Sequence, residues 1–382
     1  MVRNFDIAVV GAGPAGSAAA LRLARQGCRV ALIERSHFDA ARVGESLAPA
    51  TQPLLMELGV WPQFLELGPL ASYGTRSVWG SDEPQDHSHV MSPYGSGWHV
   101  DRTAFDHMLA QAAASAGTEL LCGAAVVACE LSDSGTWLLQ LSGAGNAAQL
   151  QARVLIDATG RGANLARWVG AQRIIFDRLV GVGTVFRDID VSREGYILVE
   201  STADGWWYSA PIPQNRMMVM LMTDGDLCGR ARLSAKAHWQ EFLTRAPMTS
   251  ARIGKTELWG PRVFSSLSQR LRRREFSAPW MAVGDAALAV DPISGSGIVR
   301  ALRSARAGAE TALSLLEEEI PRTPQGYEAE CDSACTAYLQ ERALYYAAED
   351  RWQRSAFWRR RAPQYGACAY PVDMDLHAAP EG

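Results

Sequence analysis

The chain opens with an apolar, β-branched run, after which the apolar positions change to helical spacing. Residues 5–10 (Phe-Asp-Ile-Ala-Val-Val) predict a buried strand, and the Ala/Leu-rich segment 17–26 predicts a helix. A second apolar run at 29–33 predicts the next strand. Strand, helix and strand in this order are typical of a βαβ unit in a parallel sheet.

The rest of the chain mixes helical and strand patterns. Helices are predicted near 51–58 and 101–116, the second with Phe105, Leu109 and Ala112 at helical spacing. Strands are predicted near 119–130, 136–142, 149–156 and 280–283, with turns at 133–135 and 143–146. Further helices are predicted at 233–245 and 297–318, and the last sixty residues look largely helical.

Two segments have a different character from this helix-and-strand background. Residues 70–100 are rich in Ser, Gly, Asp and His and predict strands with long loops, and residues 180–260 alternate short apolar strands with turns. Because the strand at 280–283 lies far from the opening one, the domains interleave. We predict an α/β fold, with a Rossmann-like dinucleotide-binding domain (1–75, 98–175 and 276–325), a β-rich substrate domain (76–97 and 176–275) and a helical C-terminal segment (326–382).

The first predicted strand runs into a glycine-rich turn, Gly11-Ala12-Gly13-Pro14-Ala15-Gly16. The first glycine permits the tight turn, the second lets the backbone approach a pyrophosphate, and the third lets the helix pack close to the strand. Glu34 ends the second strand, where a carboxylate can accept hydrogen bonds from both ribose hydroxyls of an adenosine. The pattern therefore predicts a dinucleotide site.

A second glycine-rich signature follows the late strand. It consists of Gly284-Asp285-Ala286-Ala287 and then Asp291-Pro292-Ile293-Ser294-Gly295-Ser296-Gly297 before a helix. Asp285 can hold the hydroxyls of a sugar alcohol, and the helix N-terminus offers N–H groups to an anionic acceptor. A nicotinamide dinucleotide has no ribityl chain that needs such an aspartate, so FAD is the predicted dinucleotide.

Composition narrows the partners. The net charge of −4 does not favour nucleic acid or an anionic membrane, and no apolar run approaches membrane-spanning length. Glycines and Pro14 interrupt the N-terminal apolar stretch, which also lacks a basic leader, so we do not expect a signal peptide. Seven scattered cysteines favour a cytoplasmic protein.

No metal site is predicted. Cys331 and Cys335 lie one helical turn apart without a second pair nearby. His87 and His89 have the spacing of a ligand pair, but a solvated loop is the favoured interpretation because no further Cys or His accompanies them.

The glycine turns, together with Glu34, Arg42-Val43-Gly44-Glu45, Arg102 and Asp157-Ala158-Thr159-Gly160, look like the FAD site of single-component flavoprotein monooxygenases. The resemblance covers residues 1 to about 320 and extends to tryptophan halogenases and geranylgeranyl reductases. It implies that Arg42 and Arg102 lie along the ribityl and phosphate groups; surface ion pairs are the alternative. The residues expected to bind FAD are Gly11, Gly13, Pro14, Ala15, Gly16, Glu34, Arg35, Arg42, Glu45, Ser46, Arg102, Val126, Asp157, Gly160, Gly284, Asp285, Asp291, Pro292, Gly295, Ser296, Gly297 and Ile298.

Two motifs resemble the halogenase branch. These are Arg42–Leu47 and Gly205-Trp206-Trp207-Tyr208-Ser209-Ala210-Pro211, which is similar to the halogenase Gly-Trp-x-Trp-x-Ile-Pro box. Halogenases also need a lysine before the substrate region, whereas residues 60–100 contain none and the only lysines are Lys236 and Lys255. Arg76 is the nearest cation, and a guanidinium cannot form a chloramine as an amine can. Halogenation is therefore disfavoured.

Flavoproteins that hydroxylate a tryptophan during maturation of tryptophylquinone enzymes share this look without the lysine. The resemblance implies an FAD-dependent monooxygenase that hydroxylates an electron-rich aromatic ring through a flavin C4a-hydroperoxide. The substrate is a small molecule or a tryptophan of a partner protein. No second Gly-x-Gly-x-x-Gly follows, so NAD(P)H binds transiently or a separate flavin reductase supplies electrons. A geranylgeranyl-type reductase and a non-catalytic FAD-bearing maturation chaperone are the alternatives.

Candidate catalytic residues follow from the same resemblance. Pro292 and Ile293 are expected to shape the oxygen pocket, and Trp206, Trp207 and Tyr208 to line the substrate cavity or form a packed sheet face. No general base is assigned, and the candidates are Asp82, Glu200 and His99. The C-terminal aromatic segment 345–360 either packs on the flavin domain or docks a partner.

Overall fold

The computed structural model describes residues 2–143, 149–192, 194–254, 256, 260–273, 278–317 and 325–362. The end of the predicted turn at 143–146, Lys255 and the segment after residue 362 lie outside these residues. The α/β fold class predicted from the sequence is confirmed.

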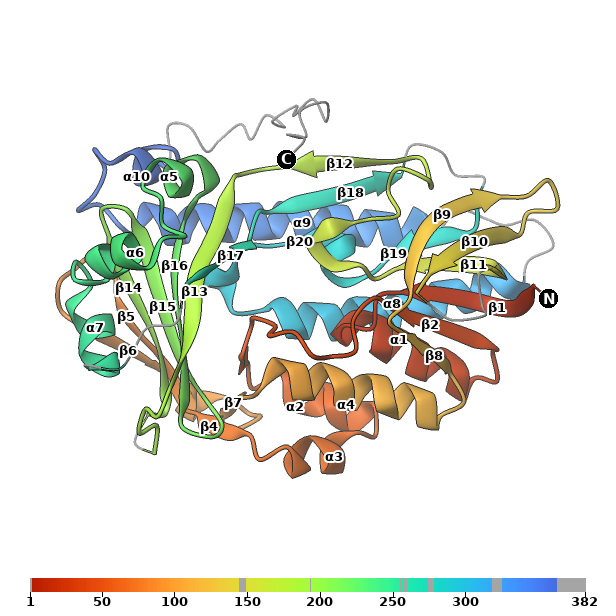
Figure 1. Ribbon diagram of the computed structural model, residues 1–382, viewed down its shortest axis with the longest axis horizontal. Coiled ribbons are helices and arrows are strands. Elements are labelled where there is room, and N and C mark those ends of the chain that lie inside the picture. Colours follow the sequence, from red (N-terminus) through yellow and green to blue (C-terminus); the bar gives the residue numbers. More distant parts are fainter. Residues whose placement is uncertain are drawn as a thin grey trace.

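A mixed sheet, parallel except for the pairings of β10, forms the centre of the first half of the molecule (Figure 1). Its strand order is β8-β2-β1-β11-β10-β9, with β19 pairing with β11. The strands are β1 (Arg3–Val10), β2 (Val30–Glu34), β8 (Glu119–Cys122), β9 (Ala125–Leu131), β10 (Trp137–Ser142), β11 (Gln149–Asp157) and β19 (Trp280–Ala282). The single strand predicted at 119–130 is thus two strands, because Gly123 adopts φ +69° between them and the second strand turns to pair with β10.

The register of this sheet brings the two glycine-rich signatures together. Val10 of β1 lies beside Asp157 of β11, and Asp157 lies beside Ala282 of β19. These three strands run parallel, so the segments that follow them emerge at the same edge. Helices α1 (Pro14–Arg25) and α8 (Gly297–Glu317) begin near this edge and pack against each other.

Helix α4 (Arg102–Ser115) covers the same sheet and packs on α1. The Asp101 carboxylate caps its N-terminus by accepting hydrogen bonds from the backbone N–H groups of Thr103 (2.8 Å) and Ala104 (3.2 Å). The short helices α2 (Thr51–Glu57) and α3 (Trp61–Glu66) lie beside it (Figure 1).

A second sheet lies at the other end of the molecule, shown largely in green in Figure 1. Its order is β17-β13-β16-β15-β14-β5-β6. The strands are β5 (Gly74–Val78), β6 (Gln85–Ser88), β13 (Leu179–Arg187), β14 (Tyr196–Thr202), β15 (Gly205–Ile212), β16 (Arg216–Asp224) and β17 (Arg262–Ser265). Strands β5 and β6 come from a segment far before the others, and this pairing supports our proposed grouping of 76–97 with 176–275.

Short helices follow β16 at this end of the molecule: α5 (Gly225–Arg230), α6 (Lys236–Leu243) and α7 (Pro247–Ile253). The helix predicted at 233–245 is α6, and Pro247 starts the separate helix α7. Trp239 of α6 packs edge-on against Trp207 of β15 at 5.0 Å, so α6 covers one face of the sheet.

Two three-stranded sheets connect the halves. One contains β12 (Ala171–Ile175), β18 (Gln269–Arg273) and β20 (Leu288–Ala289), and the other β3 (Ser46–Leu47), β7 (Gly97–His99) and β4 (Leu70–Ser72). His87 belongs to the exposed edge strand β6 rather than to a loop, and the described residues hold no cluster of metal-ligating side chains.

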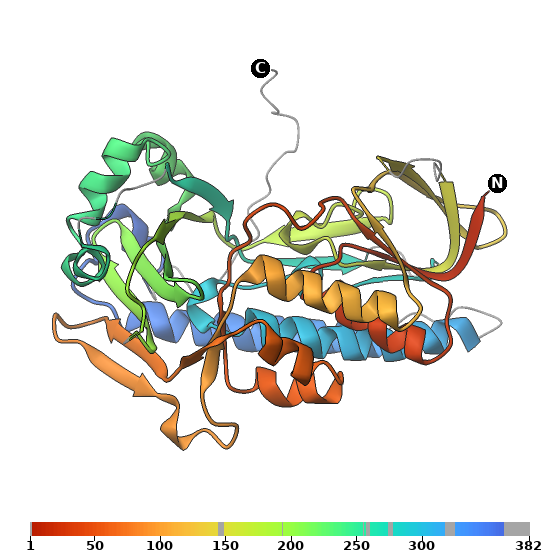
Figure 2. The ribbon, with the colours of Figure 1, turned by 60° about the horizontal axis from the view of Figure 1, so that its bottom comes forward.

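The long helix α9 (Gln325–Ala347) spans both halves, and α10 (Ala356–Arg359) follows it (Figures 1 and 2). Near its start, the Tyr327 hydroxyl donates to the Ala282 carbonyl oxygen at 2.7 Å. Tyr346, Phe357 and Trp358 are buried mainly against Trp206 and neighbouring residues of the second sheet. The Tyr346 hydroxyl also donates to Asp291 at 2.7 Å, so this segment packs only in part on the predicted flavin-binding domain. No helix in the described part of the chain is long and apolar enough to cross a bilayer.

Candidate functional site

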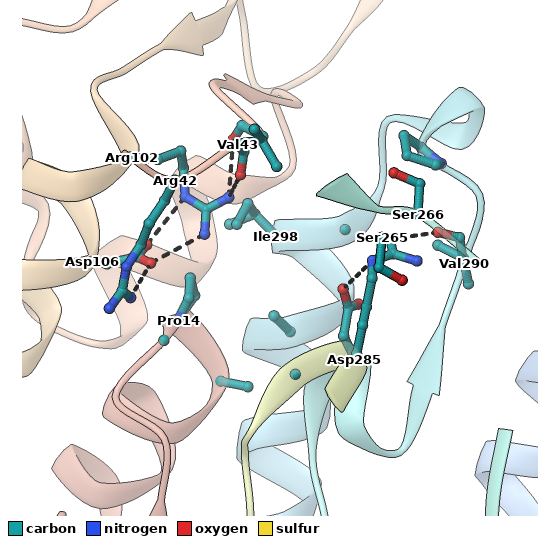
Figure 3. Close-up of a pocket in the computed structure, with 18 of the residues that line it drawn as sticks. Pro14, Arg42, Val43, Arg102, Asp106, Ser265, Ser266, Asp285, Val290 and Ile298 are labelled. Carbon is teal, nitrogen blue, oxygen red and sulfur yellow. Dashed lines mark hydrogen bonds and ion pairs between the residues drawn. The ribbon is translucent and has the colours of Figure 1, made fainter. Parts of the chain in front are cut away.

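A cavity of about 890 Å³ runs between the first sheet and the second sheet. Glu34 and Val126 line one end, and Trp206 and Met220 line the other. In Figure 3, Arg42, Arg102 and Asp106 stand on one wall, and Asp285, Ser265 and Ser266 stand on the opposite wall. The cavity is elongated and passes both glycine-rich turns.

Gly11 and Gly16 of the first turn are required by the packing of the protein itself. Gly11 has φ +105°, and a Cβ there would lie 2.7 Å from the carbonyl carbon of Ala158. A Cβ on Gly16 would lie 2.9 Å from the Ala158 Cβ, so this glycine lets α1 approach β11. Their roles are those of tight turn and close helix packing.

Gly13 has no such internal reason. Its φ is −74°, which any residue adopts, and no protein atom lies within 4 Å of the place a Cβ would take. It lines the cavity at the N-terminus of α1. A bare backbone at this point fits a ligand that approaches the helix N–H groups closely.

The second turn repeats this arrangement. Gly295 needs its φ of +60°, but Gly297, the first residue of α8, has ordinary φ and nothing within 4 Å of its Cβ position. Both residues line the cavity. Two helices of 12 and 21 residues thus present uncovered N-termini to one elongated cavity, which fits a dinucleotide whose two ends each seek backbone N–H groups.

Glu34 lines the cavity at the end of β2 and is buried. Its carboxylate accepts hydrogen bonds from the Ala12 N–H (2.9 Å), the Ser36 N–H (3.0 Å) and the Ser36 hydroxyl (2.7 Å). Burial raises the pKa of Glu34, but these hydrogen bonds and the Arg42 charge outweigh it, so the pKa lies below its usual value. The group is therefore an ionised acceptor, as binding of ribose hydroxyls requires.

Arg42 and Arg102 share one buried carboxylate, Asp106. The Arg42 Nη1 lies 2.8 Å from Oδ2 of Asp106, and Arg102 Nε lies 3.1 Å from Oδ1 (Figure 3). Arg102 also donates to the Val43 carbonyl oxygen at 2.6 Å. Arg42 also lies 3.3 Å from Oε1 of Glu34, so the two arginines form a partly buried network with two carboxylates on the cavity wall rather than separate surface pairs.

Asp285 lines the other wall and pairs with Arg161. The Arg161 Nε lies 3.3 Å from Asp285 Oδ2, while its two terminal nitrogens donate to the carbonyl oxygens of Leu267 and Val290 at 2.7 Å each. The Asp285 side chain is about one-third exposed, at 35%, so its second oxygen can accept hydrogen bonds from a ligand in the cavity.

Several predicted residues lie behind the wall rather than on it: Gly16, Asp157, Gly284, Ser296 and Trp207. Asp157 is buried and accepts hydrogen bonds from the N–H (2.9 Å) and hydroxyl (2.6 Å) of Thr159, so it shapes the turn. Gly284 has φ +61°, and a Cβ there would lie 2.7 Å from the Ala15 Cβ. The other predicted FAD and catalytic residues line the cavity.

The aromatic triplet of β15 divides between the two faces of its strand. Trp206 and Tyr208 line the cavity, whereas Trp207 packs against Trp239 on the opposite face. Successive side chains of a strand point to opposite faces, so all three could not have lined one cavity. Trp207 is a core residue.

The loop with Pro292 and Ile293 is held by the C-terminal helix. Asp291, which precedes them, is buried, and its Oδ2 accepts a hydrogen bond from the Tyr346 hydroxyl at 2.7 Å. The same hydroxyl accepts from the Trp206 Nε1 at 3.1 Å. Tyr346 therefore joins the flavin-side loop to the substrate sheet.

Sequence reasoning missed Asp106, Arg161 and several strand residues of the cavity. Asp106 could have been found from its i+4 spacing to Arg102, and Arg161 from its place directly after the Asp157–Gly160 motif. The strand residues Thr75, Val199, Met220, Met222 and Ser265, and Ser266 directly after β17, carry no local signal. Of the candidate bases, Asp82 is exposed beside Arg351, and Glu200 accepts the Met248 and Thr249 N–H groups at the start of α7.

The chain matches the family of FAD binding domains over residues 4–341, and it belongs to this family. It is 30% identical over 364 residues to the putative FAD-dependent oxidoreductase LodB of Marinomonas mediterranea, covering 94% of this chain and 97% of that protein. It is 28% identical to a tryptophan 2-halogenase of Chondromyces crocatus, over 83% of this chain and 62% of that protein. The crystal structure of the flavin-dependent halogenase CmlS superposes with a TM-score of 0.83 at 27% identity, covering 95% of this chain and 68% of that one.

These relationships and the cavity agree on the coarse function. The protein is an FAD-dependent oxidoreductase with a halogenase-like fold. The predicted cofactor, FAD, is therefore confirmed.

Proposed function

We propose that this protein is a monooxygenase that hydroxylates an electron-rich aromatic ring, and that the ring is a tryptophan side chain of a partner protein during quinone cofactor maturation. A small aromatic molecule is the alternative substrate for the same reaction. The observation that carries it is the single cavity, which passes both bare glycine turns and continues to Trp206, Tyr208, Met220 and Met222 without a lysine among its lining residues.

The cofactor would lie along this cavity. Glu34 would accept the ribose hydroxyls, the α1 N-terminus at Gly13 would take the pyrophosphate, and Asp285 would accept ribityl hydroxyls. The α8 N-terminus would stabilise negative charge on the reduced flavin ring. When bound and reduced, FAD supplies the two electrons with which dioxygen is activated.

The chain's own residues would hold and shield the ring. Trp206 and the methionines of β16 give an apolar wall that excludes water, while Pro292 and Ile293 bound the space next to the second glycine turn. Tyr346 would keep this loop and Trp206 at a fixed separation through its two hydrogen bonds.

The absence of a lysine among the described residues that line the cavity argues against halogenation. Arg76 of β5 does not enter the cavity, because its guanidinium forms a two-pronged bond to Asp86 at 2.7 and 2.8 Å on the surface. Lys236 is exposed at the start of α6, on the face of the sheet that lies away from the cavity. Neither group can hold hypohalous acid beside the substrate.

The test is oxygen incorporation. FAD-loaded protein is reduced by NADH with a flavin reductase and exposed to ¹⁸O₂ with indoles, phenols and tryptophan-containing polypeptides encoded beside this chain. We expect a product heavier by one ¹⁸O atom, formed equally with and without chloride or bromide. A strict halide requirement would establish a halogenase, and saturation of a double bond without dioxygen a reductase.

A non-catalytic chaperone is distinguished by the cofactor. If FAD only stabilises a docking protein, Gly13→Ala would weaken flavin binding and leave partner binding and maturation intact. We expect the variant to retain partner binding but to lose the oxygenated product.

A further inference from the structure

Glu45 is a buried carboxyl group with an unused oxygen at the junction of the two halves. It precedes β3, lines the cavity and is 1% exposed. Its Oε2 accepts a long hydrogen bond from the Tyr208 hydroxyl at 3.5 Å, while Oε1 has no hydrogen-bond partner among the described residues. A buried polar atom without a partner on a cavity wall indicates a ligand group that completes it.

Three further side chains form a hydrogen-bonded chain that ends at this carboxyl group. Ser46 Oγ lies 3.0 Å from the Tyr208 hydroxyl and 3.0 Å from Nδ1 of His99. Burial and the charges of Arg252 and His89 lower the pKa of His99 to about 3, so its ring is neutral. An Nδ1–H can therefore donate to Ser46, Ser46 to Tyr208, and Tyr208 to Glu45.

Burial and the neighbouring charged groups shift the pKa of Glu45 in opposite directions. Burial raises the pKa of Glu45, whereas the Arg102 guanidinium and the Tyr208 hydrogen bond lower it. Arg252 lies near His99 and Tyr208 but is itself paired with Glu194. Glu45 is thus a carboxyl group that binds a proton more tightly than an ordinary glutamate, and the hydrogen bonds through Tyr208, Ser46 and His99 hold it in place.

On the basis of the proposed function, we propose that the Glu45 carboxylate is the catalytic proton acceptor of the oxygenation and that Tyr208, Ser46 and His99 are its positioning residues. Bound FAD and dioxygen would supply an HO⁺ equivalent, and the π electrons of the substrate ring would form the new C–O bond with it. The C–H bond at the ring carbon that gained the oxygen then breaks, its electron pair restores aromaticity, and the proton passes to Oε1 of Glu45. The proton leaves with the second oxygen atom of dioxygen as water.

This assignment replaces the candidates chosen from sequence. Glu200 and Asp82 are engaged elsewhere, and His99 is separated from Glu45 by three hydrogen bonds, through Ser46 and Tyr208. Glu45 directly precedes Ser46 and β3, so the segment expected to contact the flavin would also handle the substrate proton.

The first test needs no turnover. Infrared difference spectra are recorded as indole is added to the FAD-loaded protein. We expect a shift in a carboxyl C=O band in the wild type, no such shift in Glu45→Gln, and an unchanged shift in Glu349→Gln, a matched variant of a buried glutamate away from the cavity. No shift on saturation of the wild type with indole would overturn the proposal.

The second test measures the step itself. In Glu45→Gln, oxygenated product per dioxygen consumed should fall at least about 100-fold, the range of general base catalysis. FAD affinity should stay within about threefold, less than the effect of one hydrogen bond to a charged group. A substrate deuterated at the reacting carbon should show a kinetic isotope effect in the variant and none in the wild type.

The outcomes separate the two proposals. Parallel loss of FAD affinity and product in Glu45→Gln would show that Glu45 is a flavin ligand and overturn its assignment as proton acceptor. Unchanged product would overturn it as well. A wild type that forms no oxygenated product would refute the monooxygenase function, while the infrared comparison would still decide whether Glu45 meets the aromatic ligand.

Discussion

The bare glycine at the N-terminus of α1 permits a sharp test of how the protein binds its cofactor. At Gly13, an alanine methyl would contact no protein atom, since none lies within 4 Å of the Cβ position and φ is −74°. The change should therefore leave the apoprotein intact. The methyl would instead occupy the space through which a pyrophosphate approaches the helix N–H groups.

The magnitude follows from the hydrogen bonds that the methyl would lengthen. A bond between a backbone N–H and a charged acceptor contributes about 1.5–3 kcal/mol, so losing one weakens FAD binding roughly 10- to 150-fold. The apoprotein should change by no more than about 1 kcal/mol, because alanine is allowed at this φ. FAD affinity is measured by titration of the apoprotein, and stability by thermal unfolding without cofactor.

Two other glycines provide the controls. Gly229 lies on α5, away from the cavity, and also has open space around its Cβ position, so Gly229→Ala should affect neither quantity. Gly16→Ala meets backbone atoms of Gly11, so it should destabilise the apoprotein by about 3 kcal/mol or more, beyond ordinary overpacking. The reasoning fails if Gly13→Ala binds FAD like the wild type, or if it unfolds like Gly16→Ala.

Further predictions address residues in and around the site. Tyr346→Phe removes a hydroxyl that is hydrogen-bonded to a buried carboxylate and to an indole N–H, and it should lower the free energy of unfolding, measured by heat or urea, by about 2–4 kcal/mol. The control Tyr345→Phe, at the neighbouring exposed position, should lower it by about 0.5 kcal/mol or less. Equal effects of the two variants would contradict the structure. Asp106→Asn leaves Arg42 and Arg102 without their shared carboxylate and should destabilise the apoprotein by about 3 kcal/mol. Bound FAD should reduce this loss through its phosphates, which calorimetry with and without FAD measures. A variant as stable as the wild type would refute the prediction. The pKa of Glu45 is raised in the fold, so its contribution to the stability of the folded protein falls as pH rises. Glu45→Gln should therefore stabilise the apoprotein near neutral pH, and this gain should disappear below pH 4.5. The pKa of Glu349 is lowered because hydrogen bonds from Arg351 and Ser201 outweigh burial, so Glu349→Gln should destabilise near neutral pH and lose its effect below pH 4.5; melting curves against pH that show the same sign for both variants would refute the argument.

Much of the flavin side was predictable from short stretches of sequence. The turn at Gly11–Gly16 encodes its own conformation, because only glycine tolerates φ +105° at Gly11 and the close approach of α1 to β11 at Gly16. Apolar period and turn residues likewise located β1, β2, α4 and α8. The strand at 119–130 was wrong for a local reason, since Gly123 breaks it into two.

The substrate side was less predictable, because its partners are distant in sequence. Strand alternation implied that Trp206 and Tyr208 face opposite to Trp207, but only the position of α6 decides which face is the core. Asp106 matters because a loop carrying Arg42 folds back onto α4. The chain of Glu45, Ser46, His99 and Tyr208 likewise exists only because β3, β7 and β15 meet.

By itself, the sequence determined that this protein has two glycine-rich turns able to receive the ends of a dinucleotide, an acid for the ribose, and almost no lysine. Those features are local, since backbone conformation and hydrophobic period are set by residues within a few positions of each other. Only the tertiary structure decided that both turns open into one cavity, that Tyr346 joins its two walls, and that Glu45 keeps an unpaired oxygen inside it. Side-chain partners and burial depend on packing between segments far apart in the chain, and no local pattern records them.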